Sequence, residues 1–171
     1  MSILTPGAQA PALRFHTAAG STWTLDRQAP RSFTLVAFYR GVFCPYCRAF
    51  VTTLDRLAGE FRSRGIEPVA VSVDSQENAK AAIAQWKLTS LPVGYGLDLD
   101  VARQWGLFAT QLNRDGRTIR FTEPGVFLIR PGNEIYAMLL SSLPCGRPDL
   151  PSLLEGLDYL AQQGYPARGS A

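Results

Sequence analysis

The chain has 171 residues, 46% of them hydrophobic and 18% charged, which excludes an intrinsically disordered protein and fits one domain spanning residues 1–171. No apolar run reaches the roughly 18 residues of a membrane span, so we expect no membrane association. The net charge of +3 comes without a basic stripe, which argues against a nucleic-acid partner.

The first 32 residues are rich in turn formers but keep an apolar minority that is typical of packed structure. Leu13, Phe15 and Trp23 belong to this minority, and Ser21–Leu25 has the composition of a short strand. We therefore predict an ordered N-terminal arm. Because residues 1–15 show no charged segment followed by a long apolar one, we expect no signal peptide and a cytoplasmic protein.

The next forty residues predict a strand–helix–strand unit. Phe33–Tyr39 is a short apolar run with β-branched and aromatic residues, as in a strand buried on both faces. From Cys47 to Phe61 the apolar residues recur at the spacing of an amphipathic helix, which Gly65 ends. Pro68–Val73 predicts a second buried strand, parallel to the first and joined to it by a right-handed crossover.

The second half of the chain predicts three helices and a hairpin. The first helix ends near Lys87 and would be capped at its start by Asp74 and Ser75. The other two run from Asp98 to Trp105 and from Ser152 to Gln162. Val126–Ile129 and Ile135–Leu139 are short strands around a Pro-Gly-Asn turn, a pattern typical of a hairpin. Together these elements predict an α/β domain with a mixed central sheet and helices on both faces.

The segment Cys44-Pro45-Tyr46-Cys47 lies where the first predicted strand gives way to the helix. Unpaired backbone N–H groups and the helix dipole stabilise negative charge at that point, so we expect a lowered pKa for the Cys44 thiol. Cys47 follows about one turn later and opens the apolar stripe, which predicts a more buried sulfur within reach of Cys44. Two basic residues flank the segment and would strengthen the effect: Arg40 and Arg48.

This arrangement predicts a two-thiol redox mechanism, in which Cys44 attacks a sulfur or oxygen atom of the substrate and Cys47 resolves the product. Pro45 suits the first helical position, where its missing N–H would have no partner. A zinc site needs about four ligands, and only Cys145 and His16 remain to complete one. An inert structural pair of cysteines is the third interpretation.

Six segments carry a resemblance to a known family: Gly7–Phe15, Phe38–Cys47, Val71–Ser75, Trp105–Leu107, Leu143–Pro148 and Tyr165–Gly169. They resemble the AhpC/TSA peroxiredoxin-like family of the thioredoxin-fold superfamily, in particular a subgroup with a C-P-x-C active site. The resemblance implies a thioredoxin-like fold with a peroxiredoxin-like N-terminal extension. It also implies a cis-proline loop facing the thiols, in the place that Glu123-Pro124-Gly125 occupies.

Two departures from the family concern the active site. Peroxiredoxins carry Pro and Thr seven and three residues before the reactive cysteine, where this chain has Ala37 and Gly41. Pro124 stands where the family has an arginine, as in thioredoxins, and Arg40 or Arg120 could substitute for that arginine. The site residues therefore resemble those of a dithiol–disulfide oxidoreductase.

We expect a thiol–disulfide oxidoreductase with Cys44 as the nucleophile and Cys47 as the resolving thiol. The expected supporting residues are Arg40, Pro45, Tyr46 and Pro124. The resemblance implies a thioredoxin- or glutathione-like electron donor, no metal, flavin or nucleotide cofactor, and allows a homodimer. The alternatives are a thiol peroxidase acting on hydrogen peroxide or alkyl hydroperoxides, and a non-catalytic thioredoxin-fold binding module.

Other polar and reactive side chains have simpler expected roles. Cys145 is expected to be a packed small residue, with a second resolving thiol as the alternative. Arg147 is expected at the surface or in a turn, and Asp74 as a helix cap rather than as an acid assisting proton transfer. His16 is the only histidine and lies in the N-terminal arm, where we expect no catalytic role.

Overall fold

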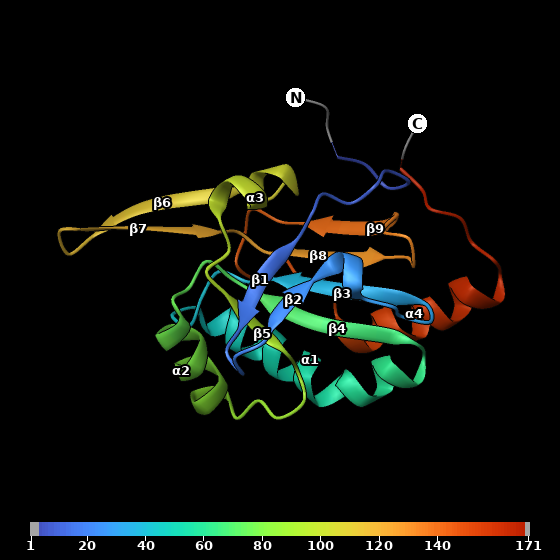
Figure 1. Cartoon of the computed structure of the whole chain (residues 1–171), viewed down its shortest axis with the longest axis horizontal. Coiled ribbons are helices and arrows are strands. Elements are labelled where there is room, and N and C mark those ends of the chain that lie inside the picture. Colours follow the sequence, from blue (N-terminus) through green and yellow to red (C-terminus); the bar gives the residue numbers. More distant parts are fainter. Residues whose placement is uncertain (1–3, 170–171) are drawn as a thin grey trace.

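Seven strands form one mixed sheet in the computed structural model, which describes residues 4–169 (Figure 1). In spatial order they are β2 (Thr22–Thr24), β1 (Arg14–Thr17), β5 (Val93–Tyr95), β4 (Ile66–Val71), β3 (Phe33–Phe38), β8 (Gly125–Ile129) and β9 (Ile135–Leu140). Strands β5, β4 and β3 are parallel, and the remaining neighbours pair antiparallel. The predicted mixed sheet and its strand–helix–strand unit are confirmed.

Helices cover both faces of this sheet. Within the same residues they are α1 (Pro45–Ser63), α2 (Gln76–Trp86), α3 (Leu99–Gln104) and α4 (Leu150–Gln162), with a short 3-10 turn η1 at Leu25–Arg27. Side chains alternate along β3, so Leu35 and Ala37 pack in one core layer and Val36 and Phe38 in the other. Helices α1, α2 and α4 bury their apolar sides in the first layer, while α3 packs in the second (Figure 1).

The N-terminal arm is ordered and belongs to the sheet. Strand β1 pairs with β2 and also with β5, so the arm extends the sheet beyond the parallel strands. The ring of Phe15 stacks on Trp23 with the centroids 4.7 Å apart. Burial of these rings confirms the prediction of a packed arm.

A separate hairpin of β6 (Ala109–Arg114) and β7 (Arg117–Thr122) reaches out from the sheet (Figure 1). Hydrophobic periodicity does not predict it, because most of its side chains are exposed and many are polar. A local signal is present in Asp115 and Gly116, whose φ angles are 51° and 73°. Two successive positive φ angles form the tight hairpin turn that Asp-Gly favours.

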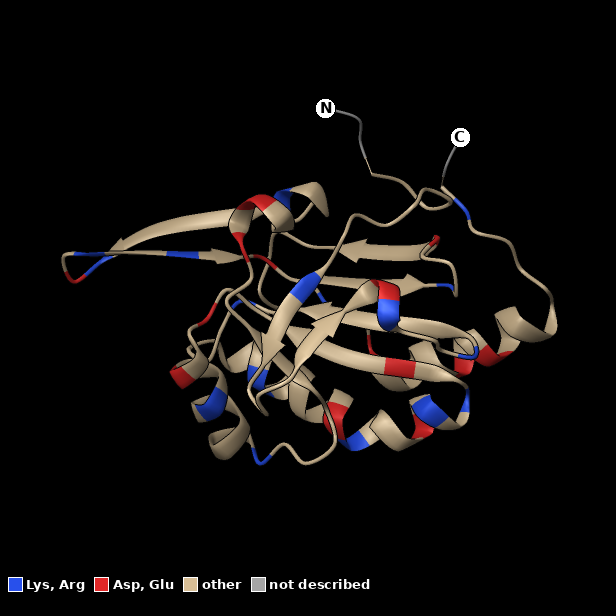
Figure 2. Ribbon diagram, in the orientation of Figure 1, with Lys and Arg blue, Asp and Glu red and all other residues tan. Residues whose placement is uncertain are grey.

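Charged residues are dispersed over the molecule. Figure 2 shows Lys and Arg interspersed with Asp and Glu along the helices and strands, in keeping with the small net charge of +3. Across residues 4–169, no helix is both long enough and apolar enough to cross a membrane.

Helix α1, which carries Cys47, is anchored through the carboxylate of Asp55. This carboxylate accepts the backbone N–H groups of Ser90 at 2.8 Å and Leu91 at 2.7 Å, and that of Thr89 at 3.1 Å. Burial raises the pKa of the Asp55 carboxyl, but these hydrogen bonds outweigh it, so the pKa is lowered on balance. The anchor fixes α1 against the loop that precedes β5.

Replacing Asp55 with Ala should lower the free energy of unfolding by about 2–3 kcal/mol, because several backbone N–H groups lose their acceptor. Since the pKa of Asp55 is lowered on folding, its contribution is present above the unfolded pKa of about 3.9 and is lost as the pH falls through the folded value. Urea unfolding at pH 7 and at successively lower pH measures both effects.

The control for this experiment is Glu60→Ala, which removes an exposed carboxylate from the same helix. That change should cost less than about 0.5 kcal/mol. Equal stability of the D55A and E60A variants would contradict the assignment of Asp55 as the anchor.

Candidate active site

Cys44 is the N-cap residue of α1 and follows the loop that leaves β3. Its backbone is extended, with φ −94° and ψ 115°, and Pro45 is the first helical residue. The Sγ atom of Cys44 accepts a hydrogen bond from the backbone N–H of Cys47 at 3.3 Å. A sulfur thus takes the position that a Ser or Asp oxygen commonly holds at a helix start. The predicted placement of Cys44 at the helix N-terminus is confirmed.

The surroundings of Cys44 lower the pKa of its thiol to about 5. The largest cause is a hydrogen bond from the Cys47 thiol; burial opposes it, and the backbone N–H of Cys47 lowers the pKa further. The guanidinium of Arg40 adds to the effect, with Nη1 3.8 Å from Cys44 Sγ. A lowered pKa enlarges the fraction of Cys44 that is thiolate at neutral pH, and the thiolate is the nucleophilic form of cysteine.

Cys47 is fully buried, and two N–H groups point at its sulfur. The backbone N–H of Arg40 lies 3.4 Å from Sγ, and Nη2 of Arg147 lies 2.9 Å from it. The hydrogen bond to Cys44 raises the pKa of Cys47, burial raises it further, and Arg147 acts in the opposite direction. The two pKa shifts are opposite in direction, lowered for Cys44 and raised for Cys47, and this predicts that the first thiolate of the pair forms at Cys44.

Arg147 lies in a loop, as expected, but the expectation missed its contact with a thiol. The residue lies in the loop between β9 and α4, but its guanidinium reaches inward to Cys47 rather than out to solvent. Because Cys47 and Arg147 are a hundred residues apart in the sequence, no local pattern predicts this contact.

The loop before Cys44 depends on Gly41 and on Asp74. Gly41 has a φ of +148°, and a Cβ there would lie 2.9 Å from Asp74 Oδ1 and 2.9 Å from the Phe43 ring. The other carboxylate oxygen of Asp74 accepts the backbone N–H of Val42 at 2.8 Å. The prediction that Asp74 caps α2 is wrong, since Ser75 holds that position and accepts the Asn78 N–H. A side chain at position 41 would be strained by this φ angle and would meet the side chains of Asp74 and Phe43.

Arg40 is fixed by a buried acid and two aromatic rings. Its Nε lies 3.1 Å from Oε2 of Glu123, and its guanidinium lies 4.6 Å from the centroid of the Phe121 ring and 5.5 Å from that of Phe43. Glu123 is itself held by the hydroxyl of Thr110 at 2.7 Å. Of the two arginines proposed to replace that of the family, Arg40 is at the thiols. Arg120 instead lies exposed on β7, donating to Gln111.

The structure differs from the expected proline loop. Among residues 4–169 no peptide bond is cis, so the bond before Pro124 is trans. Pro124 is buried, and its carbonyl accepts the N–H of Ser141 at 3.1 Å. This hydrogen bond joins Pro124 to the segment that follows β9.

A groove of about 230 Å³ lies between the first turns of α1 and the loop before α4, and neither Cys44 nor Cys47, both buried, is among its lining residues. Its lining includes Tyr46, Phe50, Cys145 and Arg147. Tyr46 is 52% exposed and lines this groove. Cys145 is exposed, so the prediction that it is packed in the core is wrong.

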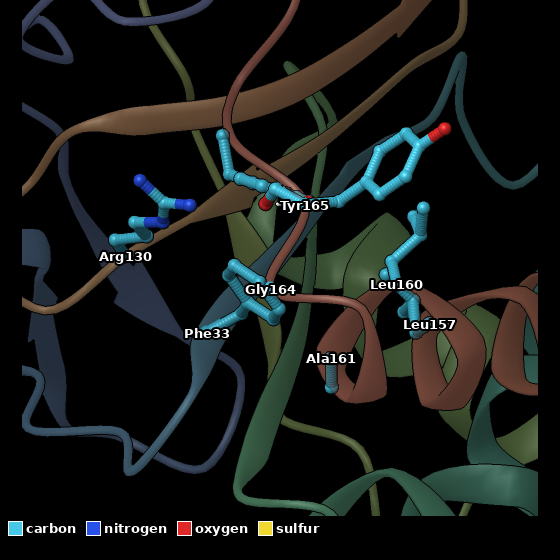
Figure 3. Close-up of a pocket in the computed structure, with 8 residues that line it drawn as sticks. Phe33, Arg130, Leu157, Leu160, Ala161, Gly164 and Tyr165 are labelled. Carbon is cyan, nitrogen blue, oxygen red and sulfur yellow. Dashed lines mark hydrogen bonds between the residues drawn. The ribbon is translucent and has the colours of Figure 1, made fainter.

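Figure 3 shows the side chains that line a second cavity, also of about 230 Å³. Phe33, Arg130 and Tyr165 are among the residues that line it. Phe33 begins β3 and Cys44 follows its end, so a strand's length separates this cavity from the thiols. Arg130 is engaged by Glu134 at 2.8 Å. With no nucleophile in its lining, this cavity is the weaker candidate.

No group of three His, Cys, Asp or Glu side chains within residues 4–169 is arranged to hold a metal ion. His16 lies exposed on β1, with its Nδ1 3.3 Å from the hydroxyl of Thr22. It therefore contacts the neighbouring strand β2 rather than either thiol.

Comparison with known proteins gives the family. The chain matches the AhpC/TSA family over residues 6–138 and belongs to that family. It is 28% identical to alkyl hydroperoxide reductase C of Mycobacterium tuberculosis (strain H37Rv) over 180 aligned positions, which cover 94% of this chain and 86% of the relative. It is 26% identical to peroxiredoxin-6 of Rattus norvegicus over 144 residues, covering 79% of this chain. The match spans only 59% of the length of that peroxiredoxin.

Solved structures agree on the fold. AhpC of Mycobacterium bovis superposes with a TM-score of 0.76 at 23% identity, covering 100% of this chain and 99% of the other. Peroxidoxin BcpB of Mycobacterium tuberculosis superposes with a TM-score of 0.74 at 16% identity, covering 92% and 99%. The thioredoxin-like, peroxiredoxin-type fold is thus confirmed, and the family is one of thiol-dependent oxidoreductases.

Replacing Cys47 with Ala should raise the pKa of Cys44 by about 1–3 units, because it removes the hydrogen bond that lowers this pKa most. Cys47→Ser keeps a hydroxyl donor and should retain more of the shift. The rate of Cys44 alkylation by iodoacetamide against pH measures both, in a Cys145→Ser background that removes the exposed thiol. An unchanged pKa in the C47A variant would refute the role assigned to this hydrogen bond.

Proposed function

We propose that the chain is a thiol–disulfide oxidoreductase in which Cys44 is the nucleophile and Cys47 the resolving thiol. The observation that carries the proposal is the lowered pKa of Cys44 at the start of α1, with Cys47 hydrogen-bonded to it and protonated. A buried pair with this division of charge supplies one attacking sulfur and one reserve thiol. The same lowered pKa counts against an inert pair and against a non-catalytic binding module.

The proposed reaction has two steps. The Cys44 thiolate attacks one sulfur of a substrate disulfide, forms a mixed disulfide and releases the other substrate sulfur as a thiolate that takes a proton from water. Cys47 then attacks the Cys44 sulfur, which closes the Cys44–Cys47 disulfide and releases the second substrate thiol. One thioredoxin-like dithiol, or two molecules of a monothiol such as glutathione, returns two electrons and two protons to restore the pair.

Reduction of a peroxide is the second candidate, supported by two observations. Alkyl hydroperoxide reductase C, to which the chain is 28% identical, is named for that activity. Arg40 also places a guanidinium 3.8 Å from the Cys44 sulfur, where it could hold a peroxide oxygen. Against it stands Gly41, which supplies no hydroxyl at the family's threonine position. In this case Cys44 would become a sulfenic acid, and Cys47 would release its oxygen as water.

The groove between α1 and the loop before α4 supports a substrate with an extended chain, such as a peptide or a tripeptide thiol. Its lining includes the exposed Tyr46 and also Arg147, which contacts the buried Cys47. We propose further that the protein works in the cytoplasm and without a metal, flavin or nucleotide. A homodimer is compatible with the family and can be measured by sedimentation.

The test is turnover with two oxidants, oxidised glutathione and hydrogen peroxide, under an excess of dithiol reductant. Cys44→Ser should abolish both activities, because it removes the attacking thiolate. With the oxidant alone and no dithiol present, Cys47→Ser should stop after the first step and accumulate a Cys44 adduct visible by mass spectrometry. The larger of the two wild-type rates identifies the substrate class. A C44S variant as active as wild type would sink the proposal.

A further inference from the structure

Arg147 is held in the loop before α4 by three contacts. Its Nε donates to the carbonyl oxygen of Pro144 at 2.9 Å, and its guanidinium lies 5.1 Å from the centroid of the Phe50 ring. Its Nη2 then lies 2.9 Å from the sulfur of Cys47. Because the first two contacts fix the plane and position of the guanidinium, the third is a built contact rather than the chance placement of a mobile side chain.

A guanidinium lies beside each of the two sulfur atoms, but only one of the two arginines is paired with a carboxylate. Arg40, beside Cys44, is paired with the carboxylate of Glu123 at 3.1 Å. In the described part of the chain no carboxylate oxygen lies within 4.0 Å of the Arg147 guanidinium. The positive charge of Arg147 is therefore directed at the Cys47 sulfur without a competing anion.

This contact matters after Cys44 has reacted. In the reduced pair the Cys47 thiol donates to the Cys44 thiolate, and that hydrogen bond keeps the proton on Cys47. Once the Cys44 sulfur is bonded to a substrate group it is neutral and no longer holds this proton strongly. Burial then still raises the pKa of Cys47. The two N–H groups that point at its sulfur, from Arg40 and Arg147, lower this pKa.

We propose that Arg147 is a positioning residue for the second step, in which it orients the Cys47 sulfur and stabilises the negative charge that develops on it. The bond from the Cys47 sulfur to the Cys44 sulfur forms as the bond from Cys44 to the substrate sulfur breaks. The bonding electron pair leaves with the substrate sulfur, which takes up the proton lost from Cys47 and departs as a thiol. Arginine keeps its own proton throughout.

The same contact acts in the reverse direction when the disulfide is reduced. If the donor thiolate attacks the Cys44 sulfur, Cys47 is the leaving group and departs as an anion beside Arg147. Leaving-group ability in thiol–disulfide exchange rises as the pKa of the leaving thiol falls. By stabilising Cys47 as the leaving thiolate, Arg147 thus favours attack of the donor on Cys44.

This inference rests on the proposed function, and a single-turnover experiment separates the two. Reduced protein in a Cys145→Ser background is mixed with oxidised glutathione, quenched with acid at intervals and analysed by mass spectrometry. The appearance of the Cys44–glutathione adduct measures the first step, and its conversion to the Cys44–Cys47 disulfide measures the second.

In the Arg147→Gln variant the second step should slow about tenfold to a hundredfold, the effect of losing one hydrogen bond from a charged donor. The first step should stay within about twofold of wild type, because Arg40 and the Cys47 thiol still surround Cys44. Arg147→Lys keeps the charge and should recover part of the second rate. Arg56→Gln removes an exposed arginine of α1 and serves as the matched control, with both steps unchanged.

A second step as fast in R147Q as in wild type would overturn the inference, and so would R147K no faster than R147Q. Equal slowing of both steps would also overturn it, because that is the effect of a general loss of structure. A wild-type protein that never forms the Cys44–Cys47 disulfide would instead refute the proposed function.

Discussion

The interaction between the two thiols is the largest cause of the lowered pKa of Cys44 and of the raised pKa of Cys47, and the rest of the site depends on it. Burial alone would disfavour a thiolate at either position. The proton held on Cys47 removes that difficulty for Cys44, which then also receives the backbone N–H of Cys47 and the guanidinium of Arg40. The result is one charged nucleophile and one neutral reserve in the same apolar layer.

The fold positions this pair through distant elements. Strand β3 ends at the loop that leads to Cys44, and the anchor at Asp55 fixes α1 behind it. The hairpin of β6 and β7 supplies Thr110 and Phe121, and the chain just beyond it supplies Glu123. These residues contact Arg40 directly or through Glu123. The β6–β7 hairpin therefore contributes to the site through the residues at its base, although its tip reaches out from the sheet.

The sequence predicts what depends on local pattern. The strand–helix–strand unit, the ordered arm, the β8–β9 hairpin and the place of Cys44 at the helix start all follow from periodicity, apolar clusters and turn residues, and all are found. The missed hairpin has exposed sides and hence no apolar periodicity, although its Asp115-Gly116 turn is a readable signal. Strand β5 has only three residues, too few for any period to be recognised.

The contacts that tune the site could not be predicted in the same way. Arg147 meets Cys47, and Asp74 meets the loop at Val42, through tertiary packing between segments far apart in the chain. The mistaken assignment of Asp74 as a cap has a physical source, since Asp and Ser side by side are equally good caps and only one position is available. The family resemblance implied a cis bond before Pro124, and the bond is trans.

The position of the shared proton is the central claim, and carbon-13 NMR of the two cysteine Cβ atoms tests it most directly. In reduced protein labelled at cysteine, the Cys44 signal should titrate with a midpoint at a pH of about 5, the value of its pKa. The Cys47 signal should remain that of a thiol throughout the neutral range. A Cys44 midpoint near the free-thiol value of about 8.5, or a Cys47 signal that shows the thiolate at neutral pH, would contradict the account.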